Sequence, residues 1–199
     1  MKDSSQPRTT RDALLDASDR LLARNGYKKM TIAALAREVG IGKGSVYLHF
    51  ASKEEIALAH LDRMVEDVKN RLWAIAGQSL PPDERLIQML VERVLMRFDN
   101  VQRYMQSLNE LLSYLRPQLL ERRKRYFDDE ARIVAAVVVE AQDASILLAG
   151  EAFEIAQMLV TATNALMPYS LSSIELEDRA DVEIRVRKLA ALLIRGLRV

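Results

Sequence analysis

Apolar residues recur at intervals of three and four along nearly the whole chain, the spacing that places them on one face of an α-helix. No stretch shows the strict alternation of apolar and polar residues that favours a β-strand. The pattern therefore predicts an all-α fold of about nine helices. The predicted helices cover approximately residues 10–25, 32–40, 43–49, 53–76, 83–98, 101–115, 117–141, 148–166 and 178–197.

Capping residues and helix breakers set the predicted helix ends. Gly26 follows the first apolar stripe and is expected to stop that helix. Ser52 and Glu55 have the spacing of a capping box, which predicts the start of the fourth helix. Pro117 lacks an amide hydrogen and is therefore placed at the start of the seventh helix. Residues 169–177, before the last helix, are predicted to be a linker.

A different pattern follows the first helix, where two short helices are joined by a tight glycine turn. Small Ala36 lets these helices approach closely, and Gly40 can adopt the positive φ that the turn requires. Val46 fills the angle between the helices, and Leu35 and Ile41 complete a small core. A helix-turn-helix of this kind leaves its second helix free to enter the major groove of DNA.

The same segment resembles the DNA-binding domain of the TetR family of transcriptional regulators. The motif K-G-x-x-Y-x-H-F-x-x-K-E of that family stands from Lys43 to Glu54 as KGSVYLHFASKE. Gly42 departs from the family, which often has a serine there to cap the recognition helix. Glycine is an acceptable N-cap and costs only a few tenths of a kcal/mol against serine, so the departure leaves the resemblance intact. The resemblance covers about a quarter of the chain.

The resemblance implies two domains and a regulatory function. Residues 1–51 would form a three-helix DNA-binding domain, and residues 52–199 a larger helical domain for effector binding and dimerisation. The expected function is a repressor that binds a palindromic operator and is released by a small apolar or amphipathic molecule. The fourth helix would transmit effector binding to the DNA-binding domain by tilting. The alternative is a DNA-binding regulator that has no small-molecule effector and is controlled by a protein partner.

The resemblance also implies a homodimer through the last two helices. Such a dimer would set two recognition helices one DNA turn apart, as a palindromic operator requires. Alternatively, the apolar stripes of these helices face the core of their own subunit. The stripes are Ile155, Leu159, Ala162 and Leu166, and Val182, Val186, Leu189, Leu193 and Leu197.

Charge divides the chain into two parts, although the whole carries a net charge of only +1. Up to Lys53 there are ten basic and five acidic residues, a net charge of +5, and the remainder carries −4. A basic N-terminal part is suited to attraction by DNA phosphates.

Composition narrows the class of protein further. The chain is 49% hydrophobic and 29% charged, as ordinary globular proteins are. It has no cysteine, which excludes disulfides and thiolate metal sites and fits a reducing compartment. No apolar run reaches the roughly 18 residues of a membrane span, and the N-terminus lacks the apolar core of a signal peptide. We therefore expect a cytoplasmic protein.

An enzyme is not expected. With two histidines and no cysteine, the chain has few of the ligands from which metal sites are built. The Glu-x-x-His pairs of di-iron helical bundles are absent. Gly40, Gly42 and Gly44 follow a helix rather than a strand, which argues against a phosphate-binding loop. We expect no catalytic residue, metal or cofactor.

The candidate DNA contacts lie on the recognition helix and at two neighbouring helix starts. Side-chain hydroxyls and amines can reach bases or phosphates, and a helix N-terminus attracts phosphate. His49 could instead cap the recognition helix. Arg8 and Arg11 could add contacts from the N-terminal arm, with simple solvation as the alternative. The candidate DNA-binding residues are Thr31, Lys43, Gly44, Ser45, Tyr47, His49 and Lys53.

The candidate effector site consists of polar or aromatic residues on otherwise apolar helix faces, for each of which plain core packing is the alternative. Arg93 and Arg97, one turn apart, are interpreted as a solvated pair, with binding of an acidic ligand as the alternative. His60 is expected at the surface or in an interface. The candidate effector-binding residues are Trp73, Met89, Phe98, Tyr104, Met105, Asn109, Tyr114 and Asn164.

Overall fold

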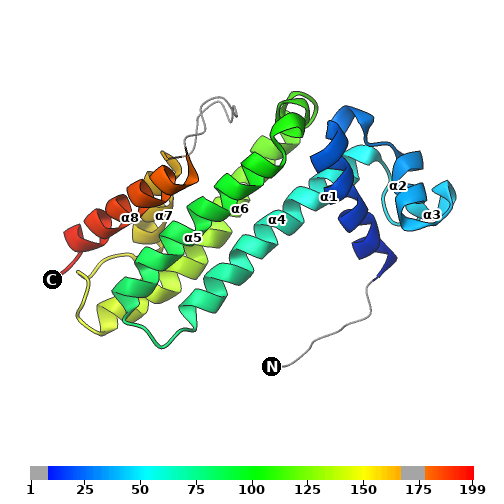
Figure 1. Cartoon of the computed structure of the whole chain (residues 1–199). Helices are drawn as coiled ribbons and strands as arrows, with labels where there is room; N and C mark the ends of the chain where they lie inside the picture. The colour runs from blue at the N-terminus through cyan, green and yellow to red at the C-terminus, as the bar shows by residue number, and fades with distance from the viewer. Residues whose placement is uncertain (1–8, 167–177) are drawn as a thin grey trace. The chain divides into compact units, whose positions relative to one another are not determined.

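The structure, a computed structural model, describes residues 9–166 and 178–199, without the side chains of residues 105–109 and 112. Within these residues the chain forms eight helices and no strand, which confirms the predicted all-α fold (Figure 1). The predicted linker at 169–177 and Arg8 lie outside the described residues. The helices are α1 (Thr10–Lys29), α2 (Ile32–Val39), α3 (Lys43–Tyr47), α4 (Lys53–Ala76), α5 (Pro82–Arg103), α6 (Met105–Asp143), α7 (Ala152–Asn164) and α8 (Arg179–Gly196).

One helix replaces two predicted ones, because Pro117 lies inside α6 instead of starting a new helix. A proline in a helix interior removes one backbone hydrogen bond, which is costly when the freed carbonyl is buried. Here Pro117 and Ser113, whose carbonyl loses that bond, are both exposed to solvent. Water can therefore satisfy the carbonyl, and the helix continues past the proline.

The helix ends predicted at Gly26 and at Ser52 are formed by backbone geometry and hydrogen bonds of neighbouring residues. Gly26 interrupts the regular path of α1 with φ 79°, and one further turn leads to Lys29. At the start of α4, the Glu55 amide donates to Ser52 Oγ over 3.2 Å. The Glu55 carboxylate accepts from the Ala51 amide over 2.6 Å, one residue earlier than in a standard capping box. Short-range hydrogen bonds therefore fix the α3–α4 junction.

The chain divides into two compact units. The first comprises Met1–Met64 and Arg103–Leu119, and the second comprises Val65–Gln102 and Leu120–Val199. Helices α4 and α6 continue through the points where the chain passes from one unit to the other. The predicted functional boundary between residues 51 and 52 is a different division and stays a prediction.

The first unit has its own hydrophobic core, built mainly by α1 to α4. The beginning of α6 adds buried Leu111 and Leu115, and Tyr104 lies beside them in the same core. Phe50, three residues after the end of α3, is 1% exposed in this core. The segment that contains α2 and α3 therefore shares a core with residues more than fifty positions further along the chain.

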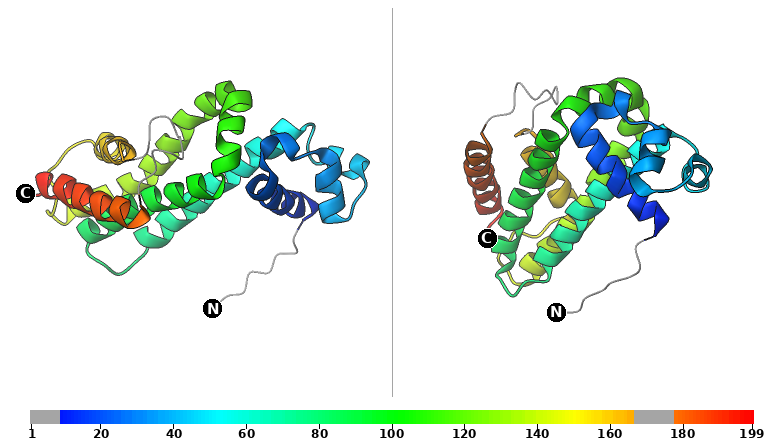
Figure 2. Two further views of the ribbon diagram at one scale, coloured as in Figure 1. Left: turned by 45° about the horizontal axis from the view of Figure 1, so that its top comes forward. Right: turned by 45° about the vertical axis from the view of Figure 1, so that its right-hand side comes forward.

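The second unit packs parts of five helices around one large core. Residues of α4, α5 and α6 meet there with the inner faces of α7 and α8, which lie side by side (Figures 1 and 2). A smaller cluster joins α5 to α8 through Phe98 and Val186. None of the described helices is long and apolar enough to cross a membrane.

His60 is buried in the first unit, with 2% of its surface exposed, so the expectation of a surface or interface position was wrong. Its ring packs edge-to-face against Tyr104 at 5.2 Å, and its Nε2 lies 3.9 Å from Asp19 Oδ1. Burial lowers the pKa of His60 to about 4, so the ring is neutral at neutral pH. Neither ring nitrogen has a hydrogen-bond partner among the described residues.

Candidate nucleic-acid interface

The helix-turn-helix predicted from spacing is present. Thr31 caps α2 by accepting a hydrogen bond from the Ala34 amide over 3.1 Å. Gly40 ends α2 in the left-handed conformation, with φ 78° and ψ 29°. The next amide, of Ile41, donates back to the Ala36 carbonyl over 2.9 Å, which closes the turn between the helices. The turn therefore has the glycine geometry that the sequence requires.

Val46 holds α3 against the rest of the helix-turn-helix. It is fully buried, together with Leu35, and Ala36 is 4% exposed beside them. This small core fixes one face of α3, so the opposite face must point outward.

The outward face of α3 carries most of the candidate DNA contacts. Tyr47 is 56% exposed, and Lys43, Gly44 and His49 are exposed as well, while Ser45 is half-buried. A Cβ atom added to Gly44 would meet nothing within 4 Å, so internal packing does not require a glycine there. Its missing side chain leaves space for an external partner to approach the backbone.

Thr31 can serve α2 and a phosphate at the same time. Its hydroxyl oxygen accepts from the Ala34 amide, and its hydrogen remains available as a donor. The side chain is exposed at the N-terminus of an eight-residue helix, where backbone amides favour a negative charge.

Lys53 has more internal contacts than the other candidates. Its ammonium lies 4.0 Å above the Tyr27 ring and 3.4 Å from the Lys28 carbonyl. Partial burial lowers its pKa, against the opposing effect of Glu54 and Glu110. The Tyr27 hydroxyl in turn donates to Glu54 over 3.1 Å. Lys53 therefore also stabilises the start of α4, whatever it contacts outside.

Arg11, predicted as an arm contact, lies over the Phe50 ring at 4.8 Å. Arg20 and Arg24 of α1 both pair with Glu38 of α2, at 2.9 and 3.2 Å. These pairs are largely exposed, so we expect less than about 1 kcal/mol from each. They join α1 to α2 through a single carboxylate.

The candidate effector residues are distributed over both units. Met89 and Phe98 are fully buried in different core clusters of the second unit. Tyr104 and Tyr114 belong to the first unit, where Tyr114 is 57% exposed and its ring lies 5.7 Å from Tyr27. Trp73 is 55% exposed on α4. The side chains of Met105 and Asn109 lie outside the described residues.

Arg93 is fully buried, so the interpretation of a solvated arginine pair was wrong. Its guanidinium donates to Glu130 on α6, and to Thr163 and Asn164 at the end of α7. Arg97 binds the other oxygen of Glu130. Burial lowers the pKa of Arg93 to about 10, which still leaves it charged at neutral pH. Burial alone would raise the pKa of Glu130, but the two arginines hold it below its ordinary value.

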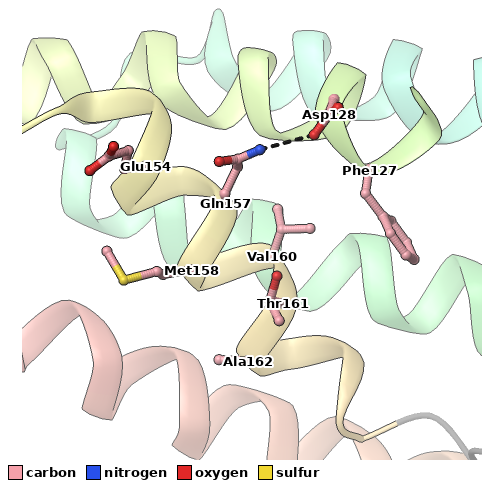
Figure 3. Close-up of a pocket in the computed structure, with 8 residues that line it drawn as sticks. All are labelled: Phe127, Asp128, Glu154, Gln157, Met158, Val160, Thr161 and Ala162. Carbon is pink, nitrogen blue, oxygen red and sulfur yellow. Dashed lines mark hydrogen bonds between the residues drawn. The ribbon is translucent and has the colours of Figure 1, made fainter. Parts of the chain in front are cut away.

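A depression of about 740 Å³ lies between α6 and α7 in the second unit (Figure 3). It is open to solvent, and Met158, at its rim, is 62% exposed. Gln157 donates to Asp128 across it over 2.9 Å. None of the candidate effector residues lines it. The lining residues are Phe127, Asp128, Glu154, Gln157, Met158, Val160, Thr161 and Ala162.

No three His, Cys, Asp or Glu side chains within residues 9–166 and 178–199 are arranged to hold a metal ion. The exposed candidate side chains from Lys43 to His49 are instead one cation, Lys43, and two aromatic rings with hydrogen-bonding groups, Tyr47 and His49. Such groups can bind the phosphates and base edges of a duplex.

Comparisons with known proteins agree with this arrangement. Residues 14–60 match the family of "Bacterial regulatory proteins, tetR family". The fatty acid metabolism regulator protein of Bacillus subtilis is 30% identical over 31% of this chain and 36% of its own length. The nucleoid occlusion factor SlmA of Vibrio campbellii is 28% identical over 71% of this chain and 84% of its own length.

Similarity in structure extends over nearly the whole chain. The crystal structure of a transcriptional regulator from Cytophaga hutchinsonii matches with a TM-score of 0.79 and 20% identity, over 94% of this chain and 97% of that one. This likeness concerns the fold alone. In sequence, the chain spans between 27% and 52% of the length of the first three curated relatives that it matches.

Proposed function

Because this chain belongs to the TetR family of DNA-binding transcriptional regulators, we propose that it is a repressor that binds a palindromic operator as a homodimer. The observation that carries this proposal is the outward face of α3. Val46 and Phe50 are buried, while Lys43, Tyr47 and His49 are presented to solvent. Binding to DNA would place the protein in the cytoplasm.

The groups on this face divide between two kinds of contact. Tyr47, His49 and Thr31 are suited to phosphates, because each has a side-chain donor that can hydrogen-bond a phosphate oxygen. Lys43 and Ser45 lie nearer the start of α3, whose N-terminal residues reach base edges in helix-turn-helix proteins. Gly44 lets the helix lie close to the duplex.

The dimer is supported by exposed apolar residues on the last two helices. Ile155, Leu159, Val182 and Val186, named from the sequence, are buried in the subunit's own core. The outer faces carry three other residues instead: Met158 on α7 and Ile184 and Leu192 on α8 are 62%, 52% and 63% exposed. Pairing these faces in two subunits would bury them.

The first experiment is selection of duplexes from a randomised pool by the purified protein. We expect a palindrome with two half-sites about one helical turn apart, because a two-fold dimer presents two recognition helices. Recovery of no enriched sequence at low salt would contradict DNA binding. A single half-site without its mirror copy would contradict the dimer.

Two tyrosines with nearly equal exposure test whether the outward face of α3 contacts DNA. Tyr47→Ala should weaken binding to all sequences about equally, because phosphate contacts carry no sequence information. Tyr114→Ala is the control, since Tyr114 is 57% exposed and Tyr47 is 56% exposed. Lys53→Ala should also weaken binding and lower the slope of log affinity against log salt by about one. Equal affinity of all three variants and the parent protein would remove these assignments.

The proposal also includes a signal that releases the DNA. A small apolar or amphipathic effector would act on the second unit, and α4 would carry the change because it belongs to both units. A regulator without such an effector is the second candidate. It is favoured by the close packing of Met89, Phe98 and Arg93, each with no exposed surface. A thermal-shift screen of apolar and amphipathic compounds, followed by operator release, separates the two.

A further inference from the structure

Leu48 is the most exposed large hydrophobic residue in the described part of the chain, at 84%. It directly follows α3 as its C-cap and keeps helical backbone angles, with φ −70° and ψ −21°. It therefore continues the outward face of the recognition helix. A branched aliphatic side chain at this position would gain free energy if a partner covered it and removed it from water.

The neighbours of Leu48 on this side of the helix are small and weakly polar. Gly44 lies four residues before it and Ser45 three residues before it, so both share its side of the helix. Gly44 adds no side chain, and the space over its Cα is open. A surface that contacts this side of α3 can therefore reach the Leu48 methyl groups without obstruction.

The polar residues of the segment offer few means of reading bases. From Lys43 to His49 there is no Arg, Asn, Gln, Asp or Glu. Arginine or lysine reads guanine, and asparagine or glutamine reads adenine, through paired hydrogen bonds. Lys43 is the one side chain of the segment that can make such a pair, so base discrimination by its other residues rests on single hydrogen bonds and on apolar contact.

The major groove presents one apolar group, the C5-methyl of thymine. We propose that Leu48 contacts a thymine methyl group in each half-site and thereby sets the preferred base at that position. The proposal rests on the DNA-binding function given above. Tyr47 and His49 would fix the position of the helix, and Leu48 would distinguish thymine from the other bases.

Uracil provides a direct test, because it differs from thymine only by the missing methyl group. The selected operator is synthesised with each thymine replaced in turn by deoxyuridine, symmetrically in both half-sites. Fluorescence anisotropy then gives the dissociation constant for the parent protein, for Leu48→Ala and for Leu48→Ile. Leu120→Ala on α6 is the control, since Leu120 is an exposed leucine of the second unit.

One symmetry-related pair of replacements should weaken binding by the parent protein about four-fold for each half-site, the value of one buried methyl group. Leu48→Ala should bind the thymine duplex more weakly and should bind the thymine and uracil duplexes equally. Leu48→Ile should retain the preference for thymine, and Leu120→Ala should behave as the parent protein does. Thermal unfolding of Leu48→Ala should match the parent protein, because the side chain is exposed.

Several results would overturn the inference while leaving DNA binding intact. These are a parent protein indifferent to every uracil, a Leu48→Ala variant that keeps the full preference for thymine, and a selected half-site without thymine. A parent protein that selects no duplex at all would overturn the proposed function, and this inference with it, before any uracil is introduced.

Discussion

Arg93 of α5 and Glu130 of α6 form a salt bridge of 2.9 Å in which neither side chain has any exposed surface. Arg93 also donates to the Val160 carbonyl and to Thr163 Oγ1, at 3.2 and 2.8 Å. One guanidinium thus joins three helices of the second unit. Because both charges are removed from water, each depends on its partners for stabilisation.

We expect Arg93→Met to lower the free energy of unfolding by about 3 kcal/mol or more, because it leaves the Glu130 charge poorly compensated in the core. Urea unfolding measures this change. The double variant Arg93→Met with Glu130→Leu should recover part of the loss, since apolar residues can replace a buried pair.

The control for this prediction is Arg71→Met. Arg71 pairs with Glu92 over 3.0 Å, but its side chain is 43% exposed. Its loss should cost less than about 1 kcal/mol. Equal costs for Arg71→Met and Arg93→Met would show that burial does not govern the contribution of Arg93.

His60 should make the stability of the first unit depend on pH. Its folded-state pKa is about 4, against 6.5 when it is exposed. Above pH 6.5 the ring is neutral in both states and contributes no pH dependence. As pH falls from 6.5 to 4, the unfolded chain binds a proton that the folded chain does not, so stability decreases by up to about 3 kcal/mol.

Several groups around His60 determine this result. Asp19 on α1 favours the protonated ring, whereas Arg63 and Arg103 oppose it, and Tyr104 covers one side. His60→Leu should remove the loss of stability between pH 6.5 and 4, as followed by thermal unfolding in a pH series. An unchanged pH profile in that variant would assign the acid sensitivity to other groups.

Two glycines of the helix-turn-helix should respond oppositely to alanine. Gly40 has φ 78°, so Gly40→Ala should destabilise the protein by about 1 kcal/mol. Gly44 lies in α3 with open space around it, so Gly44→Ala should raise stability by about 0.5 kcal/mol while weakening DNA binding. Thermal unfolding and anisotropy separate the two effects. Stronger or unchanged DNA binding by Gly44→Ala would exclude a close approach of DNA at this residue.

The outer face of α8 should contribute to the dimer interface. Ile184→Glu with Leu192→Glu should raise the dimer dissociation constant at least about 30-fold, because a charge replaces each apolar contact near the proposed interface. Sedimentation equilibrium measures it. Leu120→Glu, a change at a leucine that is 55% exposed on α6, should leave the dissociation constant unchanged. A parent protein that sediments as a monomer would contradict the interface.

The sequence predicted those features that depend on near neighbours. The Thr31 cap, the Gly40 turn and the buried Val46 all follow from interactions within about ten residues. The class of fold followed from the helical periodicity of the apolar residues along the chain. Interactions between near neighbours were therefore sufficient to predict the helix-turn-helix from the sequence.

Other features depend on contacts that periodicity does not specify. The partners of Arg93 lie 37 and 71 residues away, so nothing near it in the sequence indicated burial. His60 is enclosed by Asp19 and Tyr104, and Tyr104 comes from a different part of the chain. The exposure of Leu48 was equally hidden, because a leucine in a short helix has the same sequence signature whether it faces inward or outward.

The membership of Tyr104, Leu111 and Leu115 in the first core has a practical consequence for engineering. A fragment cut near residue 51 would lack these side chains and would expose the apolar surface that they cover. Grafting this DNA-binding segment onto another regulator therefore requires residues 103–119 to travel with it, or new side chains designed to fill their places.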